Sequence, residues 1–207
     1  GRYAYTNQPT IALWNLTRFA EALLPLLAEE DGPAVTIAQQ VLGEFHPHFH
    51  TTYFAGMRAK LGLVGEEDAD EALFKALVDH GEAEKTDMSN TFRALSHAGV
   101  LRGDVPPAGL PAGFAPWLAR WRARVAGQGG TDLTARAHGM QQVNPCYIPR
   151  NHKVEAMIAA AVKQQDYAPF HNMLRVLATP YVEQPGMEAY ATPPQPDEVV
   201  TYTYCGT

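Results

Sequence analysis

Three histidines alternate with other residues in the segment His46-Pro47-His48-Phe49-His50. Imidazole nitrogens are common ligands of zinc and copper, and side chains two residues apart on an extended segment point the same way. A metal site is therefore one interpretation of this segment. The other is a solvated cluster at a helix end, which we favour because Pro47 disturbs the regular backbone that an aligned ligand set needs. We expect no bound metal here.

A run of acidic residues covers positions 66–71 with the sequence EEDADE. Carboxylates bind divalent cations, but this run lacks the glycine and the alternating ligand spacing of a calcium loop. Acidic side chains also favour the first turn of a helix, where the backbone N–H groups carry partial positive charge. The run therefore predicts the start of a helix rather than a cation site.

Arginine and tryptophan interleave in the segment 117–124, where Arg120, Arg122 and Arg124 alternate around Trp121. Guanidinium groups beside aromatic rings can form a surface for phosphates or for stacking. The same pattern arises when a helix buries Trp117 and Trp121 and turns its arginines to solvent. We favour the second interpretation.

The segment Asn144–His152, with the sequence NPCYIPRNH, places a polar cluster directly before an amphipathic helix. Arg150 and Asn151 at a helix N-terminus are suited to holding an anion or a carboxylate. Helix capping and a buried arginine pair are the alternative interpretation. No other segment carries a catalytic signature, because GxGxxG, GxxxxGK[ST], GxSxG and HExxH are all missing from the sequence.

The composition excludes several classes of protein. The 207 residues include 16 Lys plus Arg and 22 Asp plus Glu, so the formal charge of −6 argues against a nucleic-acid partner. No apolar stretch approaches the roughly 20 residues that span a bilayer, so we expect no membrane insertion. Two cysteines without a CxxC motif give no disulfide framework, which favours a reducing, cytoplasmic location.

Apolar residues recur at a period near 3.6 through most of the chain, which predicts a mainly α-helical fold. The first helix is apolar nearly all round, so we expect it to be central, with Trp14 and Asn15 in the core. Residues 34–61 fit one helix interrupted near Pro47, or two. The predicted helices cover residues 9–27, 34–61, 66–80, 88–98, 112–126, 132–142, 152–164 and 167–177.

Residues 179–207 contain prolines and tyrosines but no helical period. We therefore divide the chain into a helical domain, 1–178, and an extended tail, 179–207, in which 199–204 fit a short strand. Gly1 is not an initiator methionine, and we expect the natural start to lie upstream.

Several motifs resemble the C-terminal part of the selenoprotein O family. Their order and spacing match along the chain, most weakly over 30–60 and 100–130, and the pairing of NPxYIPRNH with a terminal CGT is specific. The matching segments are GRYAYTNQP at 1–9, Trp14-Asn15-Leu16, Thr91-Phe92-Arg93, Asn144–His152, Pro180-Tyr181, Pro193-Pro194 and Cys205-Gly206-Thr207.

The resemblance implies a protein-kinase-like, pseudokinase fold that uses ATP and magnesium to move AMP onto Ser, Thr or Tyr hydroxyls of protein substrates. The family's catalytic, nucleotide-binding and metal-binding residues precede the GRYAYxNQP motif, so none of them lies in this chain. This chain would then be the helical C-lobe and its C-terminal extension, partnered in cis by the missing N-terminal catalytic lobe. We expect it to be inactive alone and to bind ATP and magnesium weakly or not at all.

Cys205 resembles the position at which some family members carry selenocysteine. We expect a redox role for it, through a disulfide with a cysteine in the upstream part rather than with Cys146. The alternative for the chain as a whole is an independent helical protein-interaction or scaffold module.

Overall fold

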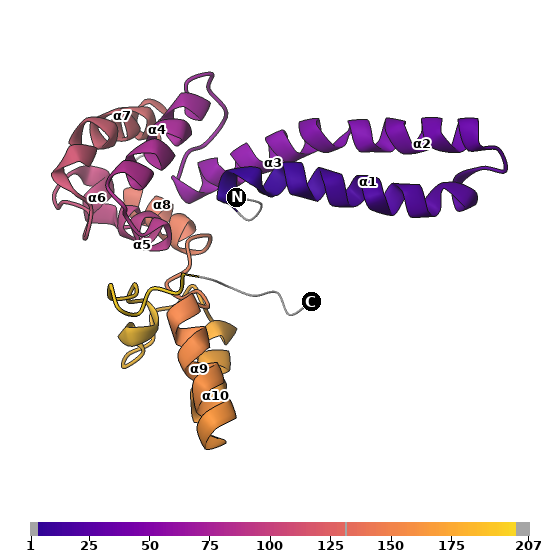
Figure 1. The fold of residues 1–207 in the computed structure, drawn as a ribbon. Coiled ribbons are helices and arrows are strands. Elements are labelled where there is room, and N and C mark those ends of the chain that lie inside the picture. Colours follow the sequence, from indigo (N-terminus) through magenta and orange to yellow (C-terminus); the bar gives the residue numbers. More distant parts are fainter. Residues whose placement is uncertain (1–3, 131, 202–207) are drawn as a thin grey trace. The chain divides into compact units, whose positions relative to one another are not determined.

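The computed structural model describes residues 4–130 and 132–201, and all regular structure in these ranges is helical (Figure 1). The chain divides into two compact units, residues 1–56 and residues 57–207. The expectation of a mainly α-helical chain is confirmed for the described residues. Among their helices, none combines the length and the apolar character that a bilayer crossing requires.

The first unit is built from two helices and most of a third. A 3-10 turn (Tyr5–Asn7) leads into α1 (Gln8–Leu27), which packs antiparallel to α2 (Asp31–Gly43), and α3 (Phe45–Lys60) follows (Figure 1). The region 34–61 is therefore two helices, and the break falls at Glu44. Pro47 lies in the first turn of α3, where a missing N–H leaves no helical hydrogen bond unmade.

Our expectation that α1 is central is wrong for this chain. None of its residues is buried; the Trp14 side chain is 48% exposed, and Asn15 is exposed as well. The physical reason is that α1 is covered only on the side that faces α2. The described part of the unit contains no further layer of helices that could cover its other sides. Trp14 instead lies beneath the Arg18 guanidinium, whose Cζ is 5.8 Å from the ring centroid.

The second unit contains the remaining helices, with contacts between α4 and α7 and between α6 and both α7 and α8. The acidic run mostly precedes α4, which begins at Asp70 and continues through Gly81, and the predicted helix 88–98 ends at Leu95 before Gly99 enters a separate helix. The elements are α4 (Asp70–Ala83), α5 (Met88–Leu95), α6 (Ala98–Arg102), a 3-10 turn (Ala112–Phe114), α7 (Ala115–Gly127), α8 (Leu133–Gln141), α9 (Asn151–Gln164), α10 (Ala168–Ala178) and a 3-10 turn (Glu188–Tyr190).

Two tryptophans of α7 form the centre of the core in this unit. Trp117 and Trp121 are one helical turn apart, and their rings stack at 5.9 Å with an interplanar angle of 13°. Each indole N–H is satisfied, since Nε1 of Trp117 donates to the Leu73 carbonyl and Nε1 of Trp121 to the Leu61 carbonyl, both at 2.9 Å. Other fully buried side chains of this unit are Phe74, Leu77, Leu95, Phe114 and Met140.

A smaller apolar cluster joins the segment before α9 to α10 and to the tail. Cys146, Tyr147 and Val176 are buried in it, and Met187 and Tyr190 of the tail pack against them. The tail is therefore held by aromatic and apolar contacts, because it has no β-sheet hydrogen bonds to hold it. Residues 199–201 form no strand, and the rest of the expected strand, 202–204, lies outside the described residues.

Candidate functional site

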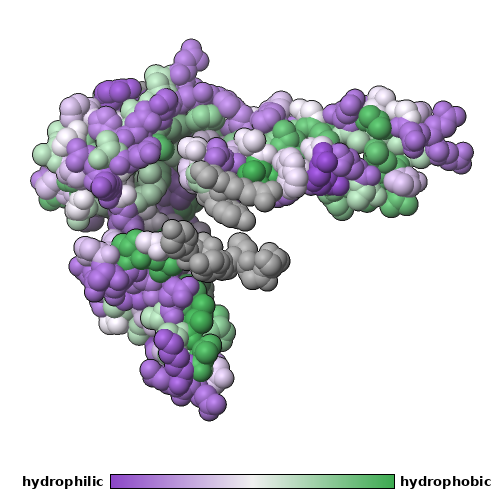
Figure 2. Space-filling model, viewed as in Figure 1, coloured by the Kyte–Doolittle hydropathy of each residue, from purple (hydrophilic) through white to green (hydrophobic). Residues whose placement is uncertain are grey.

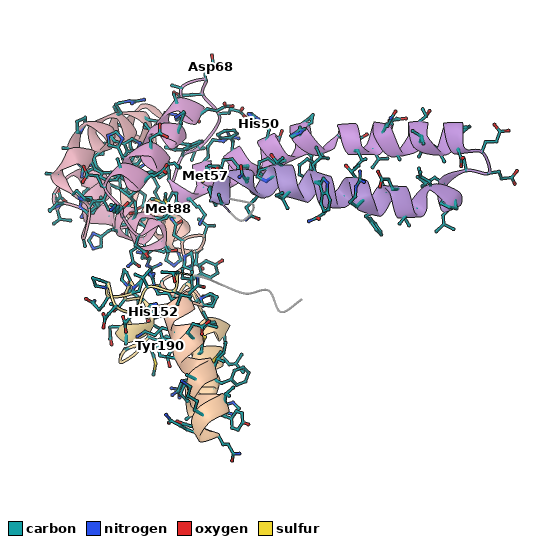
Figure 3. The ribbon with its side chains drawn as sticks, in the orientation of Figure 1. His50, Met57, Asp68, Met88, His152 and Tyr190 are labelled. Atoms are coloured by element: carbon teal, nitrogen blue, oxygen red, sulfur yellow. The ribbon has the colours of Figure 1, made fainter. Side chains whose placement is uncertain are left out.

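Polar side chains from three segments meet beside α5 in the second unit. They come from the start and outer face of α5 (Asp87, Asn90 and Arg93), from the segment 144–152, and from tail residues 179–184. We call this set of contacts the polar junction. Figure 3 shows His152 at its lower edge, where α9 begins, and Met88 at the start of α5.

An ion pair between Arg150 and Asp87 lies inside the junction. Arg150 is only 6% exposed, and its guanidinium grips both carboxylate oxygens of Asp87, with Nη1 to Oδ2 at 2.6 Å and Nη2 to Oδ1 at 3.2 Å. Nη2 also donates to Oδ1 of Asn90 at 3.2 Å. A two-pronged arrangement of this kind fixes both partners in direction as well as in distance.

Asp87 has a second role as the N-cap of α5, since its Oδ1 accepts from the Asn90 backbone N–H at 2.9 Å. Burial alone would raise the pKa of this carboxyl. The hydrogen bonds from Arg150 and from the Asn90 backbone, together with the charge of Arg150, outweigh burial and hold the pKa below its ordinary value. Asp87 is therefore ionised in the folded protein over the physiological range.

Arg93 and Asn144 connect the junction to its neighbours through backbone groups. Nη1 of Arg93 donates to the carbonyls of Gln141, Asn144 and Tyr181, and Nη2 pairs with Glu183 at 3.1 Å. The fully buried Asn144 donates from Nδ2 to the Lys60 carbonyl at 2.8 Å and to Ser96 Oγ at 2.9 Å. These side chains connect the ends of α3, α5 and α8. They donate hydrogen bonds to backbone carbonyls that have no helical partner at the end of a helix or in a loop.

The tail is fastened to the same place by backbone contacts. The Cys146 and Tyr147 N–H groups both donate to the Pro180 carbonyl, at 2.8 and 3.2 Å. The Tyr147 hydroxyl accepts from the Gln184 backbone N–H at 2.9 Å, and Gln184 Nε2 donates to the Val176 carbonyl at 2.9 Å. The junction therefore determines where the tail leaves α10.

The junction borders a cavity that is lined in part by Cys146. The cavity has a volume of about 550 Å³, and Arg93 and Glu183 are among its other lining residues. Burial raises the pKa of the Cys146 thiol, Arg93 opposes this and Glu183 adds to it, so the thiol stays protonated and is a poor nucleophile. The arrangement instead holds segments in place.

The structure brings only part of the predicted site residues together. Arg150 lies inside the junction and holds a carboxylate, that of Asp87, whereas Asn151 is exposed at the first position of α9. Cys205 lies outside the described residues. In residues 4–130 and 132–201, no three His, Cys, Asp or Glu side chains are grouped so that they could hold a metal ion.

The other candidate segments serve packing in the structure. In the helical α3, His46 and His50 lie one turn apart and contact Phe45 and Phe54 edge-on or tilted, and His48 is turned away from them. In the acidic run, the buried Asp70 pairs with Arg124, whose Nε is 2.8 Å from Oδ1. Arg124 is thus drawn inward rather than offered to a ligand.

Neither Asp87 nor Lys60 is identified from the sequence as part of this region. The partner of Asp87, Arg150, lies 63 residues away in the chain. Lys60 borders the junction, where its Nζ donates to the Val143 carbonyl at 3.0 Å and burial lowers its pKa. Arg93 is the one junction residue of α5 that the sequence analysis names. It belongs to the segment Thr91-Phe92-Arg93, which resembles the selenoprotein O family.

His152 provides a test of the junction by pH. It is buried, and its Nε2 finds no hydrogen-bond partner among the residues that the structure describes. Burial first, and then the charges of Lys153 and Arg150, lower its pKa below the ordinary 6.5, against the opposing charge of Glu198. The unfolded chain therefore takes up the proton first, and stability is complete above about pH 6.5 and falls as the pH drops below it.

We expect the wild-type chain to lose more stability than His152→Gln between about pH 8 and pH 5.5, as measured by urea titration at each pH. His171→Gln, at an exposed histidine of α10, is the matched control and should follow the wild type. Parallel pH profiles for the wild type and His152→Gln would contradict the prediction.

Comparison with known proteins shows what the chain is related to. The model of a family described as protein adenylyltransferase SelO matches residues 1–178. The chain belongs to the SelO family. A SelO-family relative named protein nucleotidyltransferase YdiU, from Bradyrhizobium sp. (strain BTAi1), is 50% identical over 210 residues and covers all of this chain. Proteins of the same name from Rhodopseudomonas palustris (strain BisB18) and Rhizobium leguminosarum bv. trifolii (strain WSM2304) are 47% and 46% identical, again over the whole chain.

The match to these SelO-family relatives is partial on their side. The chain spans about 43% of the Bradyrhizobium and Rhodopseudomonas proteins and 42% of the Rhizobium protein. The polar junction falls inside the range that the SelO model matches, except for the tail beyond residue 178. Because the relatives cover the whole chain, they share the tail as well.

Proposed function

We propose that this chain is the helical C-terminal part of a protein adenylyltransferase that transfers AMP from ATP to Ser, Thr or Tyr hydroxyls of protein substrates. The observation that carries this is the SelO-family match over residues 1–178, in a chain that spans only 43% of its relatives. The chain corresponds in this proposal to the helical C-lobe of a kinase-like fold, and the catalytic lobe precedes it in the longer protein.

The proposed reaction needs groups that the described residues of this chain do not assemble. A substrate hydroxyl oxygen forms a bond to the α-phosphorus of ATP, the bond from that phosphorus to the bridging oxygen breaks, and pyrophosphate leaves as the hydroxyl proton passes to a base. Magnesium and cationic side chains must neutralise the phosphate charge during this step. ATP and magnesium therefore belong to the longer protein.

The role of this chain in the proposal is structural and regulatory. The polar junction, through Arg150, Arg93 and Asn144, sets the position from which the tail departs. Cys205 lies in that tail, third from the last residue of the given sequence, so the junction would determine how far its thiol can reach. The redox role of Cys205 stays a prediction.

The test is label transfer from ATP by the longer protein that contains this chain. With magnesium, label at the α-phosphorus should appear on protein and label at the γ-phosphorus should not. This chain alone should transfer neither label, because its described residues form no group of ligands that could hold a metal-bound triphosphate. Transfer of the γ-label would indicate a kinase, and α-label transfer by the chain alone would reveal an independent site.

The second candidate is an independent helical interaction module. The exposed apolar side chains of α1 and α2 favour it, because such residues mark surfaces that contact another protein. This alternative predicts that the longer protein transfers no AMP even with ATP and magnesium, so the same assay distinguishes the two.

A further inference from the structure

An apolar groove runs along the helical hairpin of the first unit, between α1, α2 and the start of α3. Its volume is about 580 Å³, and its lining includes Leu16, Phe19, Leu23, Ile37, Val41 and Leu42. Glu44 and His48, both near the α2–α3 break, are the polar residues of the lining. Figure 2 shows the green, apolar side chains spread over this hairpin.

The groove leaves large apolar side chains in water. Phe19 is 61% exposed and Val41 is 64% exposed, and beside the groove Leu26 is 82% exposed. Burial of large apolar side chains is a main source of stabilisation in a folded domain, so leaving several of them exposed forgoes part of that stabilisation.

The hairpin also lacks a core that could sustain it. Only Ala34 and Ala38 are buried among the described residues of the first unit, and both are small. Two amphipathic helices are stabilised mainly by tertiary packing of their apolar faces, and an isolated pair has too little of it. An occupant of the groove would supply the missing layer.

The occupant can be chosen from the length of the relatives and from charge. The relatives match this chain from end to end and are more than twice as long, since the chain spans 43% of them. Residues 1–56 contain 2 arginines, no lysine and 5 Asp plus Glu, which gives 2 − 5 = −3. A second copy would bring the same negative charge against the groove, whereas another part of the polypeptide is free of that repulsion.

We infer that this groove is a docking surface for the part of the longer SelO-family polypeptide that lies outside this chain. The inference rests on the proposed function only in taking the chain as part of a longer protein. The occupant presents a mainly apolar face to Phe19 and Val41, with a hydrogen-bond donor or a basic group near Glu44. The exposed face of the hairpin becomes core in the longer protein.

Cysteine labelling tests this directly. Phe19→Cys and a control, Gln40→Cys, are placed in the chain and in the longer protein, each with Cys205→Ser. Gln40 is exposed on α2, carries a polar side chain and does not line the groove. Maleimide labelling is followed by peptide mass spectrometry, which separates these sites from Cys146 and from other cysteines.

In the chain alone both sites should label at similar rates, because both side chains are exposed. In the longer protein Phe19→Cys should label about 100-fold more slowly than in the chain, as burial limits labelling to local opening, while Gln40→Cys changes little. Equal labelling in both proteins would overturn the inference. Protection of Phe19→Cys in the chain alone would also overturn the inference. Protection that depends on protein concentration would identify a second copy as the occupant, and protection that does not would identify residues 57–207.

The labelling result and the transfer assay fail independently. A longer protein that protects Phe19→Cys but transfers no AMP would retain the docking surface and refute the proposed function. A longer protein that transfers AMP but in which Phe19→Cys is labelled freely would support the proposed function and overturn the docking surface. Phe19→Asp gives a second measurement, since it should lower the melting temperature of the longer protein more than Gln40→Asp does.

Discussion

Replacing Trp121 with Ala is expected to lower the free energy of unfolding of this chain by about 3–5 kcal/mol. The side chain is fully buried and stacks on Trp117 at 5.9 Å, so truncation leaves a large cavity against a rigid neighbour. It also orphans the Leu61 carbonyl, which accepts the indole N–H at 2.9 Å and would be left in an apolar core. A urea titration followed by far-ultraviolet circular dichroism measures the loss.

Two further variants separate the contributions of volume and hydrogen bond. Trp121→Phe keeps most of the ring volume and should lose less than Trp121→Ala. Arg120→Ala, at an exposed position of the same helix, should change stability by less than about 0.5 kcal/mol. A loss below about 1 kcal/mol for Trp121→Ala would show that α7 does not carry the core.

Replacing Asp87 with Ala should cost about 3–5 kcal/mol, because it leaves the Arg150 guanidinium buried without its carboxylate. The same change removes the cap of α5, which by itself contributes about 1 kcal/mol. Asp87→Asn is the matched variant, since asparagine caps a helix equally well but carries no charge. The difference between the two variants therefore measures the cap, and the loss in Asp87→Asn measures the ion pair.

The pH dependence gives a second readout for the same pair. The Asp87 pKa is lower in the folded chain than in the unfolded one, so its contribution is present above the ordinary value of 3.8 and is lost as the pH falls through the depressed value. The stability gap between the wild type and Asp87→Asn should therefore close in acid. A stability difference that stays constant down to acid unfolding would show that Arg150 does not stabilise the ionised form of Asp87.

Most helices could be predicted from the sequence because their signals are local. The prediction 132–142 corresponds to α8, Leu133–Gln141, whose cap Asp132 accepts from the Thr134 and Ala135 N–H groups at 3.0 and 2.9 Å. The prediction 152–164 corresponds to α9 within one residue. Two predicted helix ends were wrong: α4 continues past residue 80 through Gly81 to Ala83, and the helix that starts at Met88 ends at Leu95, before a separate helix, α6, that contains Gly99.

The polar junction could not be predicted, because its contacts join distant residues. Arg150 meets Asp87 across 63 positions, and Arg93 meets Glu183 across 90. The residues around an arginine that precedes a helix do not indicate whether its partner is a bound ligand or a carboxylate of the same chain. The NPxYIPRNH motif marked the place, and only packing revealed the partner.

By itself, the sequence determined the helical class, most helix positions and the family, since periodicity, caps and motif order are read along one chain. Only the tertiary structure decided that Arg150 is paired internally, that Trp117 and Trp121 form the core, and that Trp14 lies at the surface of this chain. The physical reason is that an apolar or charged side chain specifies a need for burial or pairing, whereas the partner that meets it is chosen by the packing of segments far apart in the chain.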